Sequence, residues 1–385
     1  MKELFCEMNI EEEIEAIKEC AKPCEFIVED GVLKKIKRLV CKNELIIPEG
    51  VVRIEDRILD TSEISNLERI VFPSTLVDIG EENIIGLYSP IEIITNDNFI
   101  FENGCLYTKN YKNLCLCLQD VVKGKLFVKD GCEKIYPFAF SGCRKLTKIV
   151  LPESVKEIGE WAFDKCYSVN EIVLPREINS IGANAFSNCY KLSKIELPEN
   201  LKKISYEMFD CCSLKELKIP DSVIEIEDED ITMVQKAVTF VDRFTKLILS
   251  KPNKVVMDYC NKYGVKYEFE NAKEYTLEEA KNLCKNHYGK EFLELFKEQY
   301  FAVDEHKKSE ILSRLQNIFN SVVTMKIKGQ GYIYDNQIRN WLLTNEQEIP
   351  FNEGDKKFIR YYDRFCSFLL VYNSIPCVLN NSELF

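Results

Sequence analysis

Histidine is scarce in this sequence, which has only His287 and His306 among its 385 residues. A catalytic dyad or triad built on histidine needs a nucleophile beside the imidazole and a third group that orients it. Cys284 precedes His287 by three residues, a helical spacing, but nothing nearby supplies an orienting group or an oxyanion site. A buried or boundary histidine is the simpler interpretation, and enzymatic activity is not expected.

Long apolar runs and an excess of basic residues are also missing. No segment approaches the ~18–20 consecutive apolar residues that cross a bilayer, so no membrane span is predicted. The 63 acidic residues outnumber the 51 basic ones, and the net charge of −12 repels phosphate. No basic patch is interleaved with aromatic residues. Nucleic acid is therefore not an expected partner.

The spacing of a metal site is absent as well. Cys20 with Cys24, and Cys115 with Cys117, form two pairs, whereas zinc requires about four converging ligands. We expect these cysteines to be reduced, incidental or buried thiols. The acidic residues within 225–230 lack the glycine and the alternation of a calcium loop. No metal and no cofactor is predicted.

Cysteine itself is abundant, with 17 residues, and four of them follow a strict period. Cys143, Cys166, Cys189 and Cys212 are each 23 residues apart. Residues at one equivalent position of a repeat are not disulfide partners, and a reduced cysteine packs as a small apolar residue. Reduced thiols, and a first 20 residues that are acidic without an apolar signal core, predict a cytoplasmic protein. A surface or secreted protein is the alternative.

The same period governs the sequence around these cysteines. Residues 155–177 read VKEIGEWAFDKCYSVNEIVLPRE, residues 178–200 read INSIGANAFSNCYKLSKIELPEN, and similar copies occupy 132–154 and 201–222. In each copy a short alternating strand ends at a proline, which cannot donate to a ladder. One copy cannot bury its own apolar residues, so the copies are expected to stack into a solenoid with a parallel strand ladder.

The pattern I-G-x-x-A-F-x-x-C-x-x-L-x-x-I-x-L-P, present at 158–175 and 181–198, resembles the BspA-type leucine-rich repeat. The resemblance extends in weaker form over 25–270 and departs from the period at 80–130 and 223–250. It implies an adhesion or interaction role, often on cell surfaces.

Three segments outside the regular copies also resemble parts of such solenoids. Residues 26–33 and 99–107 resemble inserted hairpins, in which a glycine after an acidic or amide residue supplies the tight turn. Residues 238–270 resemble a terminal copy with a strand, a short helix and a closing strand.

The pattern changes after residue 270. Thr276 and Glu279 form a capping box, and Ile311 and Leu315 begin an apolar series at helical spacing. Gly329 and its neighbours mark a loop or hairpin between helical stretches. We recognise no family for this part.

The predicted fold class is α/β. An N-terminal helical cap occupies 1–24, and a leucine-rich-repeat solenoid with a parallel strand ladder and inserted β-hairpins occupies 25–270. A small all-α domain occupies 271–385.

The outward residues of the repeat strands are the candidate binding residues, because strand side chains alternate between core and solvent. They are Lys148, Val150, Glu171, Val173, Lys194, Glu196, Glu216 and Lys218. In one interpretation neighbouring charges only neutralise one another. In the other they frame a protein-binding strip with Val150 and Val173 at its apolar centre.

Non-enzymatic protein recognition, or a scaffold role, through the ladder face is the favoured function. The partner is another protein; its identity and the oligomeric state do not follow from the sequence. One alternative is an effector or enzyme whose activity lies in the C-terminal helical domain, with the solenoid as targeting module. It would gather histidines and carboxylates around one pocket, namely His287, His306, Asp304, Glu305 and Asp355. Another is a secreted or surface adhesin lacking its leader, which predicts paired cysteines.

Overall fold

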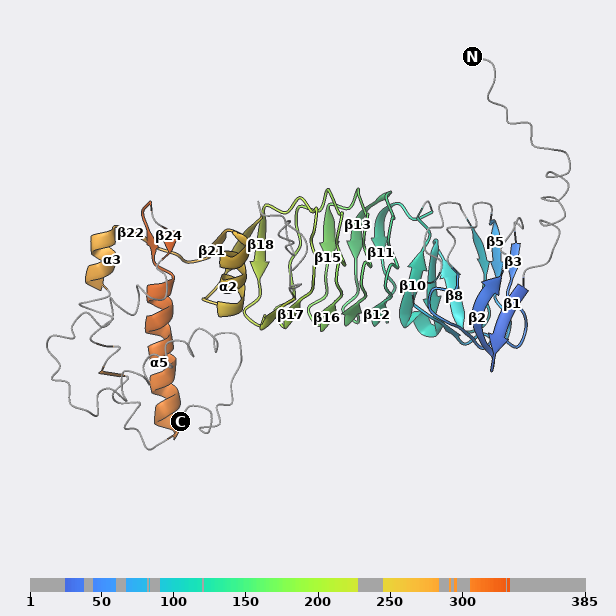
Figure 1. The fold of residues 1–385 in the computed structure, drawn as a ribbon, viewed down its shortest axis with the longest axis horizontal. Helices are drawn as coiled ribbons and strands as arrows, with labels where there is room; N and C mark the ends of the chain where they lie inside the picture. Colours follow the sequence, from blue (N-terminus) through green and yellow to red (C-terminus); the bar gives the residue numbers. More distant parts are fainter. Residues whose placement is uncertain are drawn as a thin grey trace, which may run out of the picture. The chain divides into compact units, whose positions relative to one another are not determined.

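The chain forms two compact units in the computed structural model, residues 1–215 with 227–242 and residues 216–226 with 243–385 (Figure 1). The structure describes residues 25–37, 44–59, 67–81, 83, 91–119, 121–227, 245–283, 291, 294–295, 305–329 and 331–332. The predicted helical cap at 1–24 lies outside these residues. The domain boundary expected at 270/271 stays a prediction.

The first unit is a solenoid of short, mostly parallel strands (Figure 1). Two three-stranded parallel sheets contain the strands of one side. They are β3 (Glu44–Ile46), β5 (Arg69–Val71) and β7 (Glu92–Ile94), then β11 (Gly124–Phe127), β13 (Leu146–Val150) and β15 (Glu171–Val173). Strands β3, β5, β13 and β15 are each followed by a repeat proline. The register repeats from turn to turn, because Ile149 is paired with Leu126 on one side and with Ile172 on the other.

Two further sheets line another side of the same solenoid. The first consists of β1 (Glu25–Glu29), β2 (Val32–Lys37), β4 (Arg53–Ile54) and β6 (Asp78–Ile79). The second consists of β8 (Phe99–Glu102), β9 (Cys105–Thr108), β10 (Asn113–Cys117), β12 (Lys134–Ile135), β14 (Glu157–Ile158) and β16 (Ser180–Ile181). The unit also contains the short 3₁₀ turn η2 (Lys109–Tyr111) and β17 (Lys203–Ile204).

Both predicted hairpins are confirmed. Strands β1 and β2 pair antiparallel, as do β8 and β9, in which Phe99 lies opposite Thr108. Gly31 and Gly104 occupy the turns at φ +78° and +79°, a left-handed conformation that costs glycine little. The second hairpin and β10 extend a sheet that otherwise gains one strand per repeat.

A stack of phenylalanines fills the regular repeats. Phe140, Phe163, Phe186 and Phe209 are fully buried, and their ring centroids follow one another at 5.0, 5.4 and 5.2 Å. The cysteine series runs beside this stack as predicted, buried and reduced. The Cys189 thiol, for example, donates to the Phe163 carbonyl over 3.2 Å, and burial raises its pKa to about 12.

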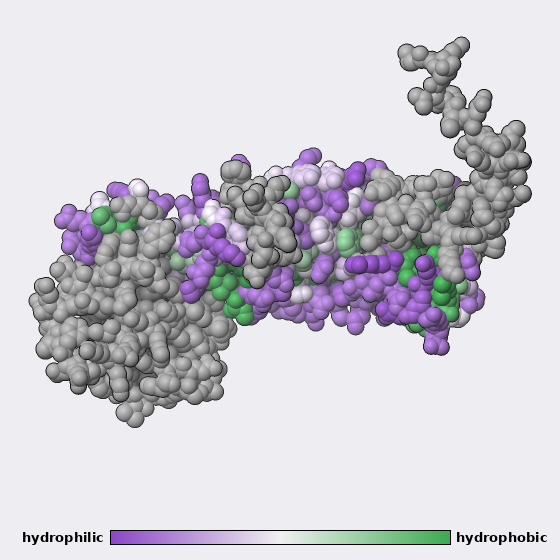
Figure 2. Space-filling model, viewed as in Figure 1, coloured by the Kyte–Doolittle hydropathy of each residue, from purple (hydrophilic) through white to green (hydrophobic). Residues whose placement is uncertain are grey.

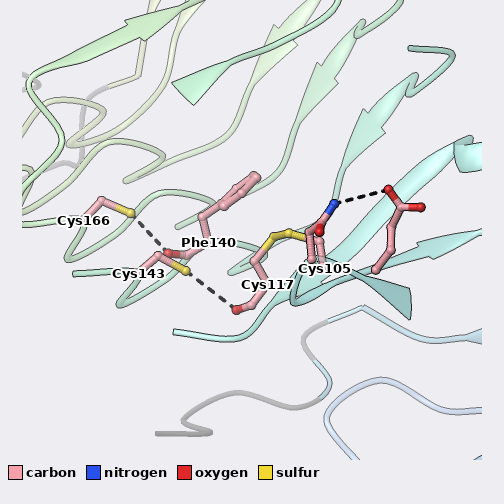
Figure 3. The surroundings of a disulfide bond; sticks show 7 residues. Cys105, Cys117, Phe140, Cys143 and Cys166 are labelled. Atoms are coloured by element: carbon pink, nitrogen blue, oxygen red, sulfur yellow. Dashed lines mark hydrogen bonds between the residues drawn. A yellow bond between two sulfur atoms is a disulfide. The ribbon is translucent and has the colours of Figure 1, made fainter. Parts of the chain in front are cut away.

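The interpretation of Cys117 as a reduced thiol is wrong. Cys117 on β10 forms a disulfide with Cys105 on β9, with their Cα atoms 4.2 Å apart (Figure 3). The two residues lie directly opposite each other across the antiparallel pair, a position that suits a disulfide. The repeat period fails in this region, so the period alone gives no cross-strand register for these residues. Cys115, two residues earlier, is buried and reduced.

The second unit begins with a strand of the last regular copy. Strands β18 (Glu216–Ile219), β20 (Lys246–Leu249) and β21 (Tyr267–Phe269) form a parallel sheet. The short strand β19 (Glu225–Ile226) follows β18, and helix α2 (Lys254–Tyr263) lies between β20 and β21. After β18 and β19, β20, α2 and β21 supply the strand, short helix and closing strand predicted for a terminal copy at 238–270. Asn253 caps α2 by accepting a hydrogen bond from the Val256 amide, and Gly264 ends it in the left-handed conformation.

The remaining described elements are β22 (Glu274–Tyr275), α3 (Leu277–Leu283), α5 (Glu305–Val323), β23 (Lys326–Ile327) and β24 (Gly331–Tyr332). The capping box is confirmed, because Thr276 donates to the Glu279 carboxylate over 2.8 Å. Strands β23 and β24 form the hairpin indicated by Gly329. With β22 they make a small sheet that accompanies the two helices and that the apolar spacing did not predict.

Contacts in this unit join residues on both sides of 270. The Glu268 carboxylate pairs with Lys326 over 3.3 Å, and the Phe269 amide donates to the Tyr332 hydroxyl over 3.0 Å. The catalytic cluster of the effector hypothesis stays untested, since His287, Asp304 and Asp355 lie outside the described residues. His306 lies exposed on α5.

Candidate functional site

The outward face of the β11–β13–β15 sheet carries one charged row and one apolar row. Leu126, Ile149 and Ile172 share a register position and point inward, so the residues on either side of each point outward. We call these six outward residues the ladder strip: Lys125, Lys148 and Glu171 in the charged row, and Phe127, Val150 and Val173 in the apolar row.

The apolar row remains open to solvent. Phe127 is 60% exposed and Val173 is 38% exposed, while Val150 between them is half-buried. The face of the first unit seen in Figure 2 is largely hydrophilic, with smaller hydrophobic areas between the polar ones. A contiguous exposed apolar row framed by charges is typical of a protein-binding surface.

Charges along the strip are partly paired. Lys148 forms an ion pair with Glu171, and this hydrogen bond lowers the pKa of the Glu171 carboxyl. The Lys125 ammonium lies over the Phe127 ring, 4.3 Å from its centroid, in a cation–π arrangement. The first strand of the sheet thus presents a cation beside its largest exposed apolar side chain.

The eight residues predicted from the sequence divide between the two units. Lys148, Val150, Glu171 and Val173 lie on the sheet as expected. Lys194 continues it through a single parallel bridge with Glu171.

The remaining predicted residues carry salt bridges. Lys194 and Glu196 are exposed and their charged groups lie 3.4 Å apart. Glu216 and Lys218 lie on β18 in the second unit, where they pair with Lys246 at 2.7 Å and Glu270 at 3.1 Å.

Phe127 and Lys125 were missed by the sequence analysis, which began the regular copies at residue 132. The signal was available, because Lys125-Leu-Phe-Val128 stands 23 residues before Lys148-Ile-Val-Leu151. Stepping one period back from Val150 therefore gives Phe127. This copy was overlooked because the 23-residue period fails over residues 80–130.

A matching pattern on the β3–β5–β7 sheet was also missed. Ile46 and Ile94 are 56% and 38% exposed at register positions on either side of Val71. Beside them Arg69 lies between Glu44 and Glu92, at 3.0 and 2.9 Å, and these contacts raise the pKa of the guanidinium. An apolar row beside a charged row thus recurs in both sheets.

A hollow of about 760 Å³ adjoins the first strand of the ladder strip. Its lining includes Val121 to Lys123 before β11, the residues of β11 from Lys125 onward, and Asn103 at the tip of the second hairpin. Val150 to Pro152 also line it. Nearby, Glu102 accepts hydrogen bonds from Lys129 and from the Tyr111 hydroxyl, and these contacts lower its pKa.

Within the described ranges, no group of three histidine, cysteine or acidic side chains is arranged to hold a metal ion. Among the same residues no helix is long and apolar enough to span a membrane.

A family model of the BspA type leucine-rich repeat region matches residues 123–231 in six copies. This part of the chain carries BspA-type leucine-rich repeats. The matched region includes every residue of the ladder strip, so the strip belongs to the regular BspA-type copies and begins with the first of them.

Several solved bacterial structures are similar to this chain. The pneumococcal vaccine antigen PcpA is 18% identical, with 60% of each chain covered and a TM-score of 0.41. A leucine-rich repeat protein of T. pallidum is 27% identical over 40% of this chain and 69% of its own, with a TM-score of 0.31. A leucine-rich cell surface protein of Faecalibacterium prausnitzii is 16% identical over 64% and 93%, with a TM-score of 0.32. The chain thus spans 60% of the PcpA chain. No curated protein matches it.

Proposed function

We propose that this protein is a non-enzymatic recognition protein that binds another protein through the ladder strip. The observation that carries the proposal is the exposed apolar row of Phe127, Val150 and Val173, aligned by strand register and bordered by charge. Desolvating this row supplies binding free energy, and the charged row fixes register and excludes wrong partners.

The stacked repeats explain why such a surface binds without large losses of conformational entropy. Each repeat strand is hydrogen-bonded to its neighbours, and the phenylalanine stack behind it is fully buried. The strip residues are therefore held in place before a partner arrives, which lowers the cost of ordering the interface.

The disulfide favours the surface or secreted alternative over the cytoplasmic prediction. Disulfides persist in oxidising compartments and are rare in the cytosol. The buried cysteine series is compatible with either setting, because the thiols of Cys143, Cys166 and Cys189 are shielded from solvent. We therefore propose recognition at a cell surface or in a secreted form, with no enzymatic step assigned.

Capture of a partner by the full-length protein on beads tests the function. Replacing Val150 and Val173 with aspartate should abolish capture of a protein that the wild type retains. The matched control replaces Val52 and Val77, which are 43% and 55% exposed and lie outside the strip, with aspartate. Equal loss in both double variants, or capture unchanged by V150D/V173D, would refute recognition through the strip.

A further inference from the structure

Strand β11 is the first strand of its sheet. The sheet order is β11–β13–β15, so among the described residues β11 has a strand neighbour on one side only. The sheet of β3, β5 and β7 likewise ends at β7. The inserted hairpin lies between these two sheets in the chain, and it adds β8 and β9 to the other side of the solenoid. The ladder that carries the strip is therefore interrupted before β11.

Within the described part of the chain, some backbone groups of β11 have no hydrogen-bonding partner at this edge. The Val128 amide donates to the Val150 carbonyl over 3.0 Å, toward β13. Successive residues of a strand direct their amide and carbonyl groups to opposite sides. Lys125 and Phe127 therefore direct their backbone amide and carbonyl groups away from β13. No described backbone group forms a hydrogen bond with these amides and carbonyls.

The surroundings of this edge are hollow and basic. The hollow of about 760 Å³ adjoins β11 and the residues that precede it. Residues 121–129 contain three lysines and no acidic residue, in a chain whose net charge is −12. Lys123 and Lys125 are exposed, whereas Lys129 is paired with Glu102. Among the residues that the structure describes, Asp130 is the one acidic side chain that lines the hollow.

We propose that β11 accepts an extended, acidic segment of a partner protein as an additional strand. Backbone groups of Lys125 and Phe127 would pair with the incoming strand, as in β-strand addition. An acidic residue would lie beside Lys125, and an apolar residue two positions away would lie beside Phe127, because alternate residues share one face. This proposal rests on the proposed function and names the chemistry of the partner at one end of the ladder strip.

Binding of synthetic peptides to the full-length protein tests strand addition. The probe is a blocked, fluorescein-labelled nonapeptide, Thr-Glu-Thr-Val-Thr-Glu-Thr-Val-Thr, which presents glutamate and valine on one face in either chain direction. The matched control has lysine in place of glutamate and should bind at least ten-fold more weakly in fluorescence polarisation. The Lys125→Glu variant should instead bind the lysine peptide more tightly than the glutamate peptide. Equal binding of both peptides, or no binding of either, would overturn the proposal.

Backbone methylation separates an added strand from a peptide that lies on the face. Two further probes carry N-methyl groups either on the threonines or on the glutamates and valines. An added strand directs only one of these sets of amides toward β11, so one probe should lose at least ten-fold in affinity and the other should bind almost as the parent does. Equal affinities would overturn strand addition without involving any protein variant.

A proline variant gives the same test from the side of the protein. Phe127→Pro removes the outward amide while leaving the bonds of β11 to β13, and edge strands tolerate proline at such positions. It should bind the glutamate probe about ten-fold more weakly than Phe127→Ala, with thermal unfolding showing that both variants fold. If Phe127→Pro fails to fold, the N-methyl probes decide.

Two outcomes distinguish this proposal from its premise. In the first outcome, partner capture requires Val150 and Val173, but the N-methyl probes bind as tightly as the parent peptide. This result would refute strand addition and leave recognition by the ladder strip intact. Dimerisation seen by sedimentation, and abolished by Phe127→Pro, would show that a second copy of the chain occupies the edge and would overturn the assignment to another protein.

Discussion

Single residues hold the repeats together through contacts that recur at the same position of each copy. Phe186 is fully buried between Phe163 and Phe209, with ring centroids 5.4 and 5.2 Å away. The Cys212 thiol donates a hydrogen bond to the Phe186 carbonyl over 3.1 Å. Because each ring packs on both neighbouring copies, the loss of one ring affects two interfaces between repeats.

Replacing Phe186 with alanine should lower the free energy of unfolding by ~3–5 kcal/mol, because it leaves a cavity inside the stack. Urea denaturation measures the change. Tyr190→Ala is the matched control: this tyrosine stacks on Tyr167 at 5.1 Å but is 51% exposed, so the loss should stay below ~1.5 kcal/mol. Equal losses in the two variants would contradict the inward assignment of Phe186.

The Cys105–Cys117 disulfide makes a prediction about thiol counts. Wild type and the C105S/C117S variant, unfolded without reductant and labelled with a thiol reagent, should give the same number of reactive thiols, because the bonded pair does not react. Mass spectrometry of the labelled chains reads the number. Two fewer thiols in the variant than in the wild type would show that the pair is reduced.

At the scale of the elements, the charges of the strip differ in their surroundings. The Lys148–Glu171 pair joins two hydrogen-bonded strands. Lys194 and Glu196 extend beyond them with side chains that are 71% and 84% exposed. Exposed ion pairs contribute little to stability, since water and salt screen them. The side chains of Lys194 and Glu196 are thus available for contacts with a partner.

Replacing both Lys194 and Glu196 with alanine should leave the free energy of unfolding within ~0.5 kcal/mol of the wild type. Chemical denaturation of the purified variants provides the test. Leu192→Ala in the same copy, at a fully buried position, should cost ~2–5 kcal/mol and shows that the assay responds to this repeat. A large loss in the double variant would mean that another part of the molecule covers these side chains.

The sequence predicted the regular repeats well because their period repeats the same physical constraints. The inward phenylalanines, the buried cysteine series and both hairpins follow from spacing and turn chemistry, and the structure has them. Strand β11 was missed because the hairpin shifts the chain before it, and the pairing with β13 slips between Gly124 and Lys125. The disulfide depends on cross-strand register, which a repeat period does not specify.

At the scale of the whole molecule, the change of sequence pattern near 270 does not mark a gap in contacts. Tyr332 stacks on Tyr267 at 5.7 Å and meets Phe269 edge-on at 5.0 Å. Lys326 also bridges Glu268 and Glu274, at 3.3 and 3.4 Å. The small β22–β23–β24 sheet is therefore attached to the parallel sheet of the second unit.

Tyr332→Ala should destabilise the second unit by ~2 kcal/mol, because it removes two aromatic pairs and the hydrogen bond from the Phe269 amide. Hydrogen exchange of the β21 amides in the full-length protein measures the effect. Lys281→Ala, at an exposed position on α3, should leave exchange unchanged. Faster exchange in both variants, or in neither, would show that this ring does not join the two sheets.

The even spacing of the phenylalanine stack bears on how such a chain changes over generations. Each inner copy meets its neighbours through the same rings, thiols and strand register, so an in-frame duplication or deletion of 23 residues would create a junction like those already present. The solenoid would lengthen or shorten in steps of ~4.8 Å, the spacing of adjacent strands. The length of surface that the solenoid offers to a partner would thus change by whole copies. The interrupted edge at β11, in contrast, goes with the one inserted hairpin that precedes it.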